Sequence, residues 1–134
     1  FKINDDFDGA NLFKKIDVGV EFFQTQYAFD ELILQKYMKR LNQLGIISKV
    51  YFIVGLGIIK SAKSARWMNA NLFGINIPDD IIKRIDKSEN EKAEGKKICI
   101  ELIQKYKSIE GVSGIHLMGY KQEEDIASVI SHFQ

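Results

Sequence analysis

The 134-residue chain has very little cysteine and proline and no long apolar run, and these shortages exclude several classes of protein. A single cysteine, Cys99, cannot form an internal disulfide, which fits a reducing compartment and predicts a cytoplasmic location. The longest apolar run, Val50 to Ile59, is interrupted by two glycines and is far shorter than the roughly 20 residues that cross a bilayer. We therefore expect no membrane partner. Cys99 falls on the apolar stripe of a helix and is predicted to be a core residue.

The chain also lacks an excess of either charge. Nineteen basic and eighteen acidic residues leave a formal charge of +1, and the two signs are interspersed. A nucleic-acid-binding protein would carry a basic stripe, so no nucleic-acid partner is predicted. No metal site is predicted, because neither His116 nor His132 has a second histidine or cysteine at ligand spacing. His116 should be tucked among the strands and hydrogen-bonded to a neighbour, and His132 should lie on the surface.

The chain contains a regular alternation of helix and strand patterns. Apolar residues at three- and four-residue spacing predict helices, and short continuous apolar runs predict buried strands. Asp8 and Asp30 are expected as N-caps, and a charged, solvated turn is expected between Asp86 and Glu94. The predicted helices are 8–18, 30–45, 61–70, a segment after Pro78, 95–106 and 123–133, and the predicted strands are 20–26, 49–54, 73–77 and 112–118.

Strands separated by helices imply right-handed crossovers and a parallel sheet in one α/β domain that spans residues 1–134. Two architectures fit: a small open sheet with helices on both faces, or about four consecutive strand-helix units of an eightfold barrel. A complete barrel takes about 250 residues, so in the second case the chain is half of one. Because parallel strands with unpaired edges are rarely left uncovered, a half barrel requires its other half from elsewhere.

The segment from Glu21 to Asp30 is the most informative part of the chain, because a buried strand ends in Gln24-Thr25-Gln26 and runs straight into a helix. Carboxyl ends of parallel strands are where α/β proteins place ligand contacts. Periodicity alone favours the interpretation that these polar residues merely finish a strand and hydrogen-bond the next loop. Tyr120 follows the last predicted strand and is a second candidate at this end.

Other features favour structural roles. Gly55-Leu56-Gly57 lacks the third glycine of a dinucleotide fingerprint and the Lys-Ser/Thr of a P-loop, so it is expected to form a turn. Trp67 and Met68 lie at helical spacing and could cover a flat ligand, but such side chains usually belong to the core.

The stretch Lys15 to Asp30 resembles the methylenetetrahydrofolate reductases, in which a helix ends at Asp-x-Gly and the next strand ends in Thr-Gln before aromatics and Asp. Phe73 to Pro78, Gly95 and Gly111 to Met118 resemble later parts of the bacterial and archaeal branches of that family. The match runs in order from about Asp8 to the C-terminus. The resemblance implies a flavin-containing TIM-type (β/α)8 barrel, with this chain as the C-terminal half that supplies the fifth to eighth strands.

The family's chemistry is hydride transfer. Reduced nicotinamide reduces a tightly held FAD, which then reduces 5,10-methylenetetrahydrofolate to 5-methyltetrahydrofolate in one-carbon metabolism and methionine biosynthesis. The implied partners are the folate substrate, NAD(P)H or another redox protein as electron donor, the missing N-terminal half of the barrel, and further copies in a homo-oligomer. The sequence leaves open whether the flavin is FAD or FMN.

The resemblance also implies site residues. Gln26 matches the strand-end glutamine that contacts the folate or the nicotinamide, and its amide can donate and accept hydrogen bonds at once. The helix that lines the adenosine and phosphate end of FAD supplies a carboxylate for sugar hydroxyls and lysines for the pyrophosphate, here Asp8, Asn11, Lys14 and Lys15. The residues alone favour the interpretation of this cluster as a solvated helix face with ordinary salt pairing.

The departures from the family pattern matter as much as the matches. Val54-Gly55 replaces Pro-Gly, Ser64 stands where a second glutamine approaches the nicotinamide, and Gln122 stands where an arginine contacts the folate. The family's catalytic glutamate lies on the first strand, so no catalytic residue is expected in this chain. The competing hypothesis is a non-catalytic α/β module that binds a protein partner through its sheet edge.

Overall fold

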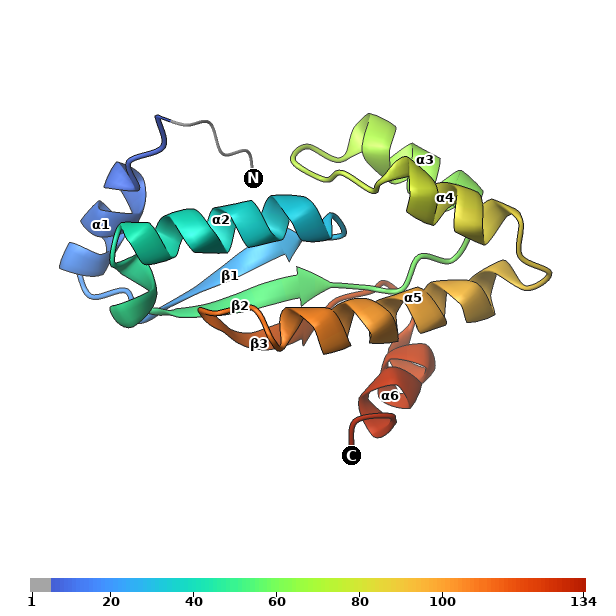
Figure 1. The fold of residues 1–134 in the computed structure, drawn as a ribbon. Helices are drawn as coiled ribbons and strands as arrows, with labels where there is room; N and C mark the ends of the chain where they lie inside the picture. The colour runs from blue at the N-terminus through green and yellow to red at the C-terminus, as the bar shows by residue number, and fades with distance from the viewer. Residues whose placement is uncertain (1–5) are drawn as a thin grey trace.

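The fold is built on a parallel sheet of three strands in the order β1-β2-β3 (Figure 1). The computed structural model describes residues 6–134. The strands are β1 (Phe22–Tyr27), β2 (Tyr51–Leu56) and β3 (Val112–Leu117), each within two residues of a predicted strand. This confirms an α/β chain in which parallel strands alternate with helices.

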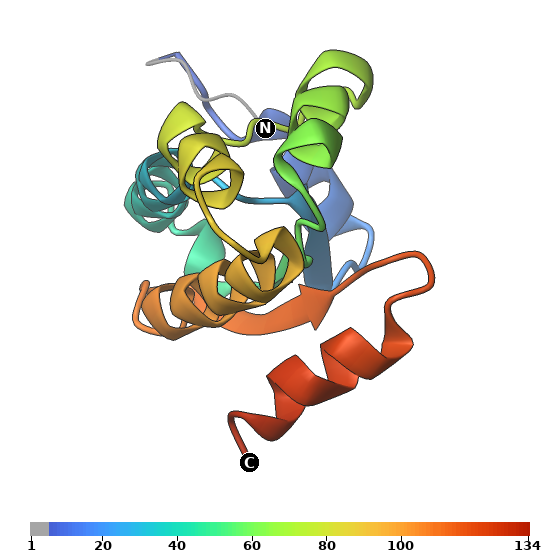
Figure 2. The ribbon, with the colours of Figure 1, turned by 90° about the vertical axis from the view of Figure 1, so that its right-hand side faces the viewer.

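Helices make every connection between the strands. Figures 1 and 2 show α2 and α5 on one face of the sheet, with α3 and α4 beyond the carboxyl ends of the strands. Within residues 6–134 no helix is long and apolar enough to cross a membrane. The helical elements are α1 (Ala10–Asp17), α2 (Glu31–Gln43), the 3-10 turn η1 (Ile46–Ser48), α3 (Ala62–Asn71), α4 (Asp79–Asp86), α5 (Glu91–Tyr106) and α6 (Glu123–Ser131).

The predicted strand at 73–77 is wrong, and with it the count of four strand-helix units. This segment is the connection between α3 and α4, and Gly74 turns it with a φ of 80°. Ile77 is buried like a strand residue, but its backbone groups pair with a side chain instead of a neighbouring strand. Its N–H donates to Asn69 Oδ1 at 2.7 Å, and its carbonyl accepts from Asn69 Nδ2 at 2.9 Å. Residues 6–134 therefore supply three strands.

The helix starts follow the capping residues closely. Asp30 caps α2 as predicted, because its carboxylate accepts from Ile33 N at 3.1 Å. At α1 the N-cap is Gly9, and Asp8 instead accepts from Ala10 N at 2.9 Å. The predicted 86–94 turn is shorter than expected, since Asn90 caps α5 and the helix begins at Glu91.

The core lies between the sheet and helices α2 and α5. Phe52 on β2 packs edge-on against Tyr37 of α2, with ring centroids 6.4 Å apart. At the end of α5 the buried Tyr106 hydroxyl donates to the carbonyl oxygen of Ala28 at 2.7 Å, which ties this helix to the end of β1. Cys99 is buried in this core, as predicted, and burial raises the pKa of its thiol to about 12.

Helix α5 also touches the loop after β2. Gly95 permits this contact, because a β-carbon at that position would lie 1.8 Å from the carbonyl oxygen of Ile59. No side chain can be accommodated there unless the helix moves away from the loop.

We predict that Gly95→Ala destabilises the protein by about 1–3 kcal/mol, the usual cost of overpacking, although alanine is the better helix former. Urea denaturation measures the change. Lys97→Ala, at an exposed position on the same helix, should stay within about 0.5 kcal/mol of wild type. A Gly95→Ala variant as stable as the Lys97→Ala control would show that α5 does not rest on this loop.

Candidate functional site

Both outer strands carry a β-bulge where they pair with β2. On β1, Gln24 pairs with Ile53 but Tyr27 pairs with Gly55, so β1 holds one extra residue. On β3 the pairing partner shifts by one residue between Phe52 and Ile53 in the same way. Bulges bend a strand and increase its twist, and they occur at barrel rims and beside active sites.

Each bulge is closed by a hydroxyl side chain. Thr25 Oγ1 accepts from Gly55 N at 2.9 Å and donates to the carbonyl oxygen of Gln26 at 2.7 Å. On the other side Ser113 Oγ accepts from Phe52 N at 3.2 Å. The hydroxyls thus satisfy β2 amides that the shifted ladder would leave unpaired.

The bulge on β1 determines how the predicted strand-end amides are used. Thr25 has a structural role, whereas Gln26 is exposed and its Oε1 accepts from the backbone N–H of Tyr27 at 3.1 Å. Gln24 hydrogen-bonds His116, which confirms that this histidine is tucked among the strands with a partner. His132 is exposed, also as predicted.

Segments that follow all three strands enclose a recess of about 340 Å³, which we call the carboxyl-end cavity. Tyr27 and Phe29 stack in it at 5.4 Å between centroids and 15° between planes. Burial raises the pKa of Tyr27, so its hydroxyl stays protonated at neutral pH. The remaining lining is mostly apolar: Gly57, Ile58, Ile59, Lys60, Ser64, Trp67, Met68, Leu72, Gly119, Tyr120 and Gln122.

Two aromatic side chains of this cavity are unusually open to solvent. Trp67 on α3 is 57% exposed and Tyr120 after β3 is 78% exposed. The expectation that Trp67 belongs to the core is therefore wrong, while Met68 is partly buried against the core. Exposed aromatics at the edge of an apolar recess are suited to holding a flat ring.

Ser64 and Gln122, two of the three places where a departure from the family pattern is expected, line the cavity and hold its walls through hydrogen bonds. Ser64 completes a capping box at the start of α3, since Ser61 Oγ accepts from Ser64 N at 3.0 Å and Ser64 Oγ accepts from Ser61 N at 3.2 Å. Gln122 is buried, and its Nε2 donates to the carbonyl oxygen of Ile58 at 3.1 Å.

The predicted site residues fall at two ends of the sheet. Gln26 and Tyr120 lie at the carboxyl ends. Tyr120 lines the cavity, and so does Tyr27, the residue that follows Gln26. Helix α1 lies instead beside the amino ends of the strands and the end of α2 (Figure 1). Arg40 Nε, near the end of α2, donates to the carbonyl oxygen of Phe7, just before α1, at 2.9 Å.

The α1 cluster of Asp8, Asn11, Lys14 and Lys15 is exposed. Lys15 Nζ lies 5.9 Å from the ring centroid of Phe23, and no described residue forms an ion pair with either lysine. Two ammonium groups that pair with no described carboxylate, in the same exposed segment as an amide and a carboxylate, are groups suited to the diphosphate and sugar of a dinucleotide.

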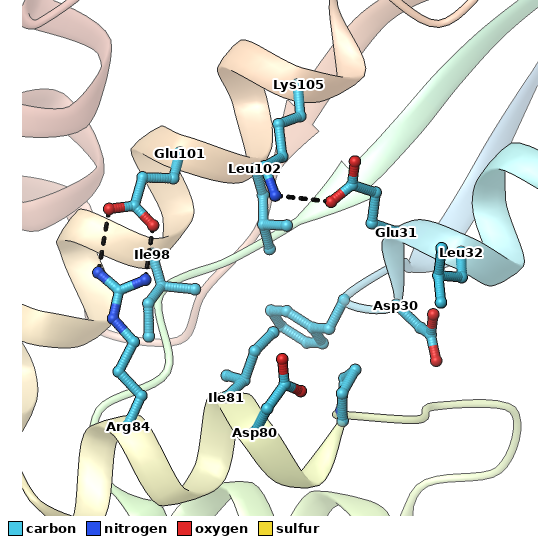
Figure 3. Close-up of a pocket in the computed structure, with 12 residues that line it drawn as sticks. Asp30, Glu31, Leu32, Asp80, Ile81, Arg84, Ile98, Glu101, Leu102 and Lys105 are labelled. Carbon is cyan, nitrogen blue, oxygen red and sulfur yellow. Dashed lines mark hydrogen bonds and ion pairs between the residues drawn. The ribbon is translucent and has the colours of Figure 1, made fainter.

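A second cavity, of about 240 Å³, lies between α2, α4 and α5 (Figure 3). Arg84 binds Glu101 at 2.6 and 3.0 Å and Glu94 at 2.6 Å, and Lys105 binds Glu31 at 2.7 Å. The hydrogen bonds to Arg84 lower the pKa of Glu101. These charges satisfy one another and join the helices, so we assign them a structural role. No three metal-ligating side chains cluster in the part of the chain that the structure describes.

The comparisons with known proteins place the chain. A family model described as methylenetetrahydrofolate reductase matches residues 4–134. The chain belongs to the methylenetetrahydrofolate reductase family. No curated protein matches it. A solved structure matches with a TM-score of 0.52 and 20% identity, over 93% of this chain and 48% of that one. It is described as "Uncharacterized protein from Clostridium thermocellum binds two copies of 5-methyl-5,6,7,8-tetrahydrofolic acid".

This second likeness concerns the fold. At 20% identity it supports an arrangement of parallel strands and helices consistent with part of a TIM-type barrel. The chain spans about half the length of that structure. The sequence patterns did not predict either bulge, although Thr25 and Ser113, the one aliphatic hydroxyl residue in each of these strands, were a visible signal.

We predict that Thr25→Val destabilises the protein by about 1–3 kcal/mol, because valine keeps the shape but leaves the Gly55 N–H without an acceptor. Thr25→Ser keeps the hydroxyl and should lose less than half as much. Chemical denaturation of both variants measures the difference. Equal stability of the two would mean that water or the backbone satisfies Gly55.

Proposed function

We propose that this chain forms the C-terminal part of a cytoplasmic, flavin-dependent enzyme that reduces 5,10-methylenetetrahydrofolate to 5-methyltetrahydrofolate. The observation that carries the proposal is the carboxyl-end cavity, an aromatic recess to which the segments after all three strands contribute. Ligand sites of α/β barrels occupy this end of the sheet. Family membership and the methyltetrahydrofolate that the solved neighbour binds point to the same substrate class.

The cavity offers both kinds of contact that a folate requires. Trp67 and Tyr120 provide exposed ring faces for the flat part of the substrate. Gln26 precedes the lining residue Tyr27 and would supply an amide that donates and accepts, which suits a pterin edge that presents both kinds of group. Lys60 lines the cavity and Lys121 lies 5.2 Å from the Tyr120 ring centroid, so ammonium groups are close by for the acidic tail.

The flavin, FAD in this proposal, would be held by Asp8, Asn11, Lys14 and Lys15 at its adenosine and diphosphate end. Bound flavin supplies the hydride, with NAD(P)H or another redox protein as the source of electrons. The chain's own residues would position the folate and keep water from the reacting atoms.

The remaining barrel strands are the main partner in this proposal. β1 and β3 each pair on one side only, and Phe22 and Tyr51 are 54% and 67% exposed on the sheet face turned away from α2. A closed barrel would cover both edges and this face. The acid that protonates the folate would come from those strands.

We predict that the native polypeptide is yellow and shows a bound-flavin absorbance spectrum. The double variant Lys14→Glu/Lys15→Glu should lose most of its flavin, because carboxylates repel the diphosphate. Lys36→Glu/Lys39→Glu, at exposed positions on α2, is the matched control and should keep it. A colourless native protein that takes up neither FAD nor FMN contradicts the proposal and leaves the non-catalytic module as the function.

We predict that Gln26→Ala slows folate reduction about tenfold, the value of roughly one hydrogen bond at the reacting ring, with flavin content unchanged. Steady-state and single-turnover rates measure the effect. Gln104→Ala, at an exposed position on α5, should react like wild type. Unchanged turnover of Gln26→Ala would remove this residue from the site.

A further inference from the structure

Gln24 and His116 meet across the central strand on the sheet face turned away from α2. The side chains of Phe23 and Phe52 point toward α2, so by alternation the side chain of Gln24 points away from it. Alternation from Phe52 also puts Gly55 on the face turned away from α2, and His116, which pairs with Gly55, lies on that same face. Gln24 Nε2 and His116 Nδ1 lie 2.5 Å apart, although 92 residues separate them in sequence.

Gly55 lies beside this contact, where the central strand closely approaches both of its neighbours. A β-carbon there would lie 2.6 Å from Met118 Cε and 2.7 Å from the carbonyl oxygen of Thr25, so β2 cannot carry a side chain at this position. Gly114, on the same face of β3, has no atom within 4 Å of where its β-carbon would be, so the surface beside the pair is open.

The amide nitrogen of Gln24 faces His116 Nδ1, and an amide nitrogen can only donate. This orientation of the amide corresponds to the imidazole tautomer that carries its proton on Nε2, whereas a proton on Nδ1 would require the amide oxygen to face the ring. The half-buried His116 thus presents an N–H group at a defined place on the face that lies inside a closed barrel.

Part of this face is more polar than a usual barrel interior. Such interiors are normally filled by branched apolar side chains in layers. Here Gln24 and His116 lie on the same face as Phe22 and Tyr51, and beside them Gly55 and Gly114 carry no side chain, so hydrogen-bonding groups stand next to an open stretch of strand.

We propose that His116 is a ligand-binding residue, held by Gln24 as the Nε2–H tautomer so that it donates to a carbonyl oxygen or ring nitrogen of the flat heterocycle on this face. That heterocycle is a pteridine or an isoalloxazine, which share this acceptor chemistry. The inference rests on the proposed function, since it specifies a contact in the same site. It adds a residue and a partner that neither family membership nor the carboxyl-end cavity assigns.

Two substitutions separate a ligand role from a structural one. The amide nitrogen of His116→Gln falls near the position of Nε2, whereas the amide of His116→Asn falls near Nδ1 and reaches only Gln24. With the full-length protein, we expect His116→Asn to bind 5-methyltetrahydrofolate or flavin about five- to tenfold more weakly, and His116→Gln to stay within about twofold of wild type. His132→Asn, at the exposed histidine, is the matched control.

The tautomer is measured directly by ¹⁵N NMR of protein labelled at histidine, with His116 assigned from the His116→Gln spectrum. Nε2 should carry the proton, and Gln24→Met should abolish that preference. A ring protonated at Nδ1 overturns the proposal, as does a wild-type affinity of His116→Asn for both ligands. Loss in the folate titration identifies a pteridine partner, and loss of flavin absorbance an isoalloxazine. A wild-type protein that binds neither ligand overturns the proposed function as well, whatever the tautomer.

Discussion

The structure depends on the backbone hydrogen bonds that β2 forms with its two neighbouring strands, β1 and β3. The pairing of β1 and of β3 with β2 shifts by one residue along the strand. At these shifts the hydroxyl oxygens of Thr25 and Ser113 accept hydrogen bonds from β2 N–H groups that would otherwise be unpaired. Bulges bend a strand and increase its local twist, so both outer strands are set to turn relative to β2. The two hydroxyl groups stabilise this arrangement, because they pair with the β2 N–H groups at the bulges.

Close backbone approaches then fix the cavity around the carboxyl end of β2. A β-carbon at Gly57 would lie 2.6 Å from the carbonyl oxygen of Met118 and 2.7 Å from Tyr27 Cε1, so the loop after β2 lies in direct contact with both neighbours. Gly95 brings α5 against the same loop. These contacts explain why a cavity built from irregular segments can be well defined, because each segment is held by backbone that has no room to shift.

Features of the fold that depend on residues close together in the sequence were predicted correctly, whereas those that depend on residues far apart were missed. Periodicity and capping rules correctly predicted three local features: Asp30 caps α2, Pro78 precedes α4 and Cys99 is buried. The error at 73–77 arose because buried isoleucines in a short apolar segment have the sequence pattern of a strand. The backbone of Ile77 pairs with the side chain of Asn69 and not with a neighbouring strand, and the apolar pattern does not indicate this contact. The Gln24 and His116 contact depends on register across β2, which no local pattern specifies.

The position of Tyr120 shows how the departures from the family pattern fit together. Gln122 turns inward to Ile58, and Lys60 Nζ donates to the carbonyl oxygen of Tyr120 at 3.3 Å, so the turn after β3 is held from both sides. Lys121 adopts a left-handed φ of 54°, a conformation that costs a non-glycine residue about 1 kcal/mol or more. The two hydrogen bonds hold this turn, and the Tyr120 ring lies exposed at the cavity edge with Lys121 Nζ 5.2 Å from its centroid. Lys60 and Lys121 thus place positive charge beside Tyr120, close to the buried Gln122, the position at which the family resemblance implies an arginine.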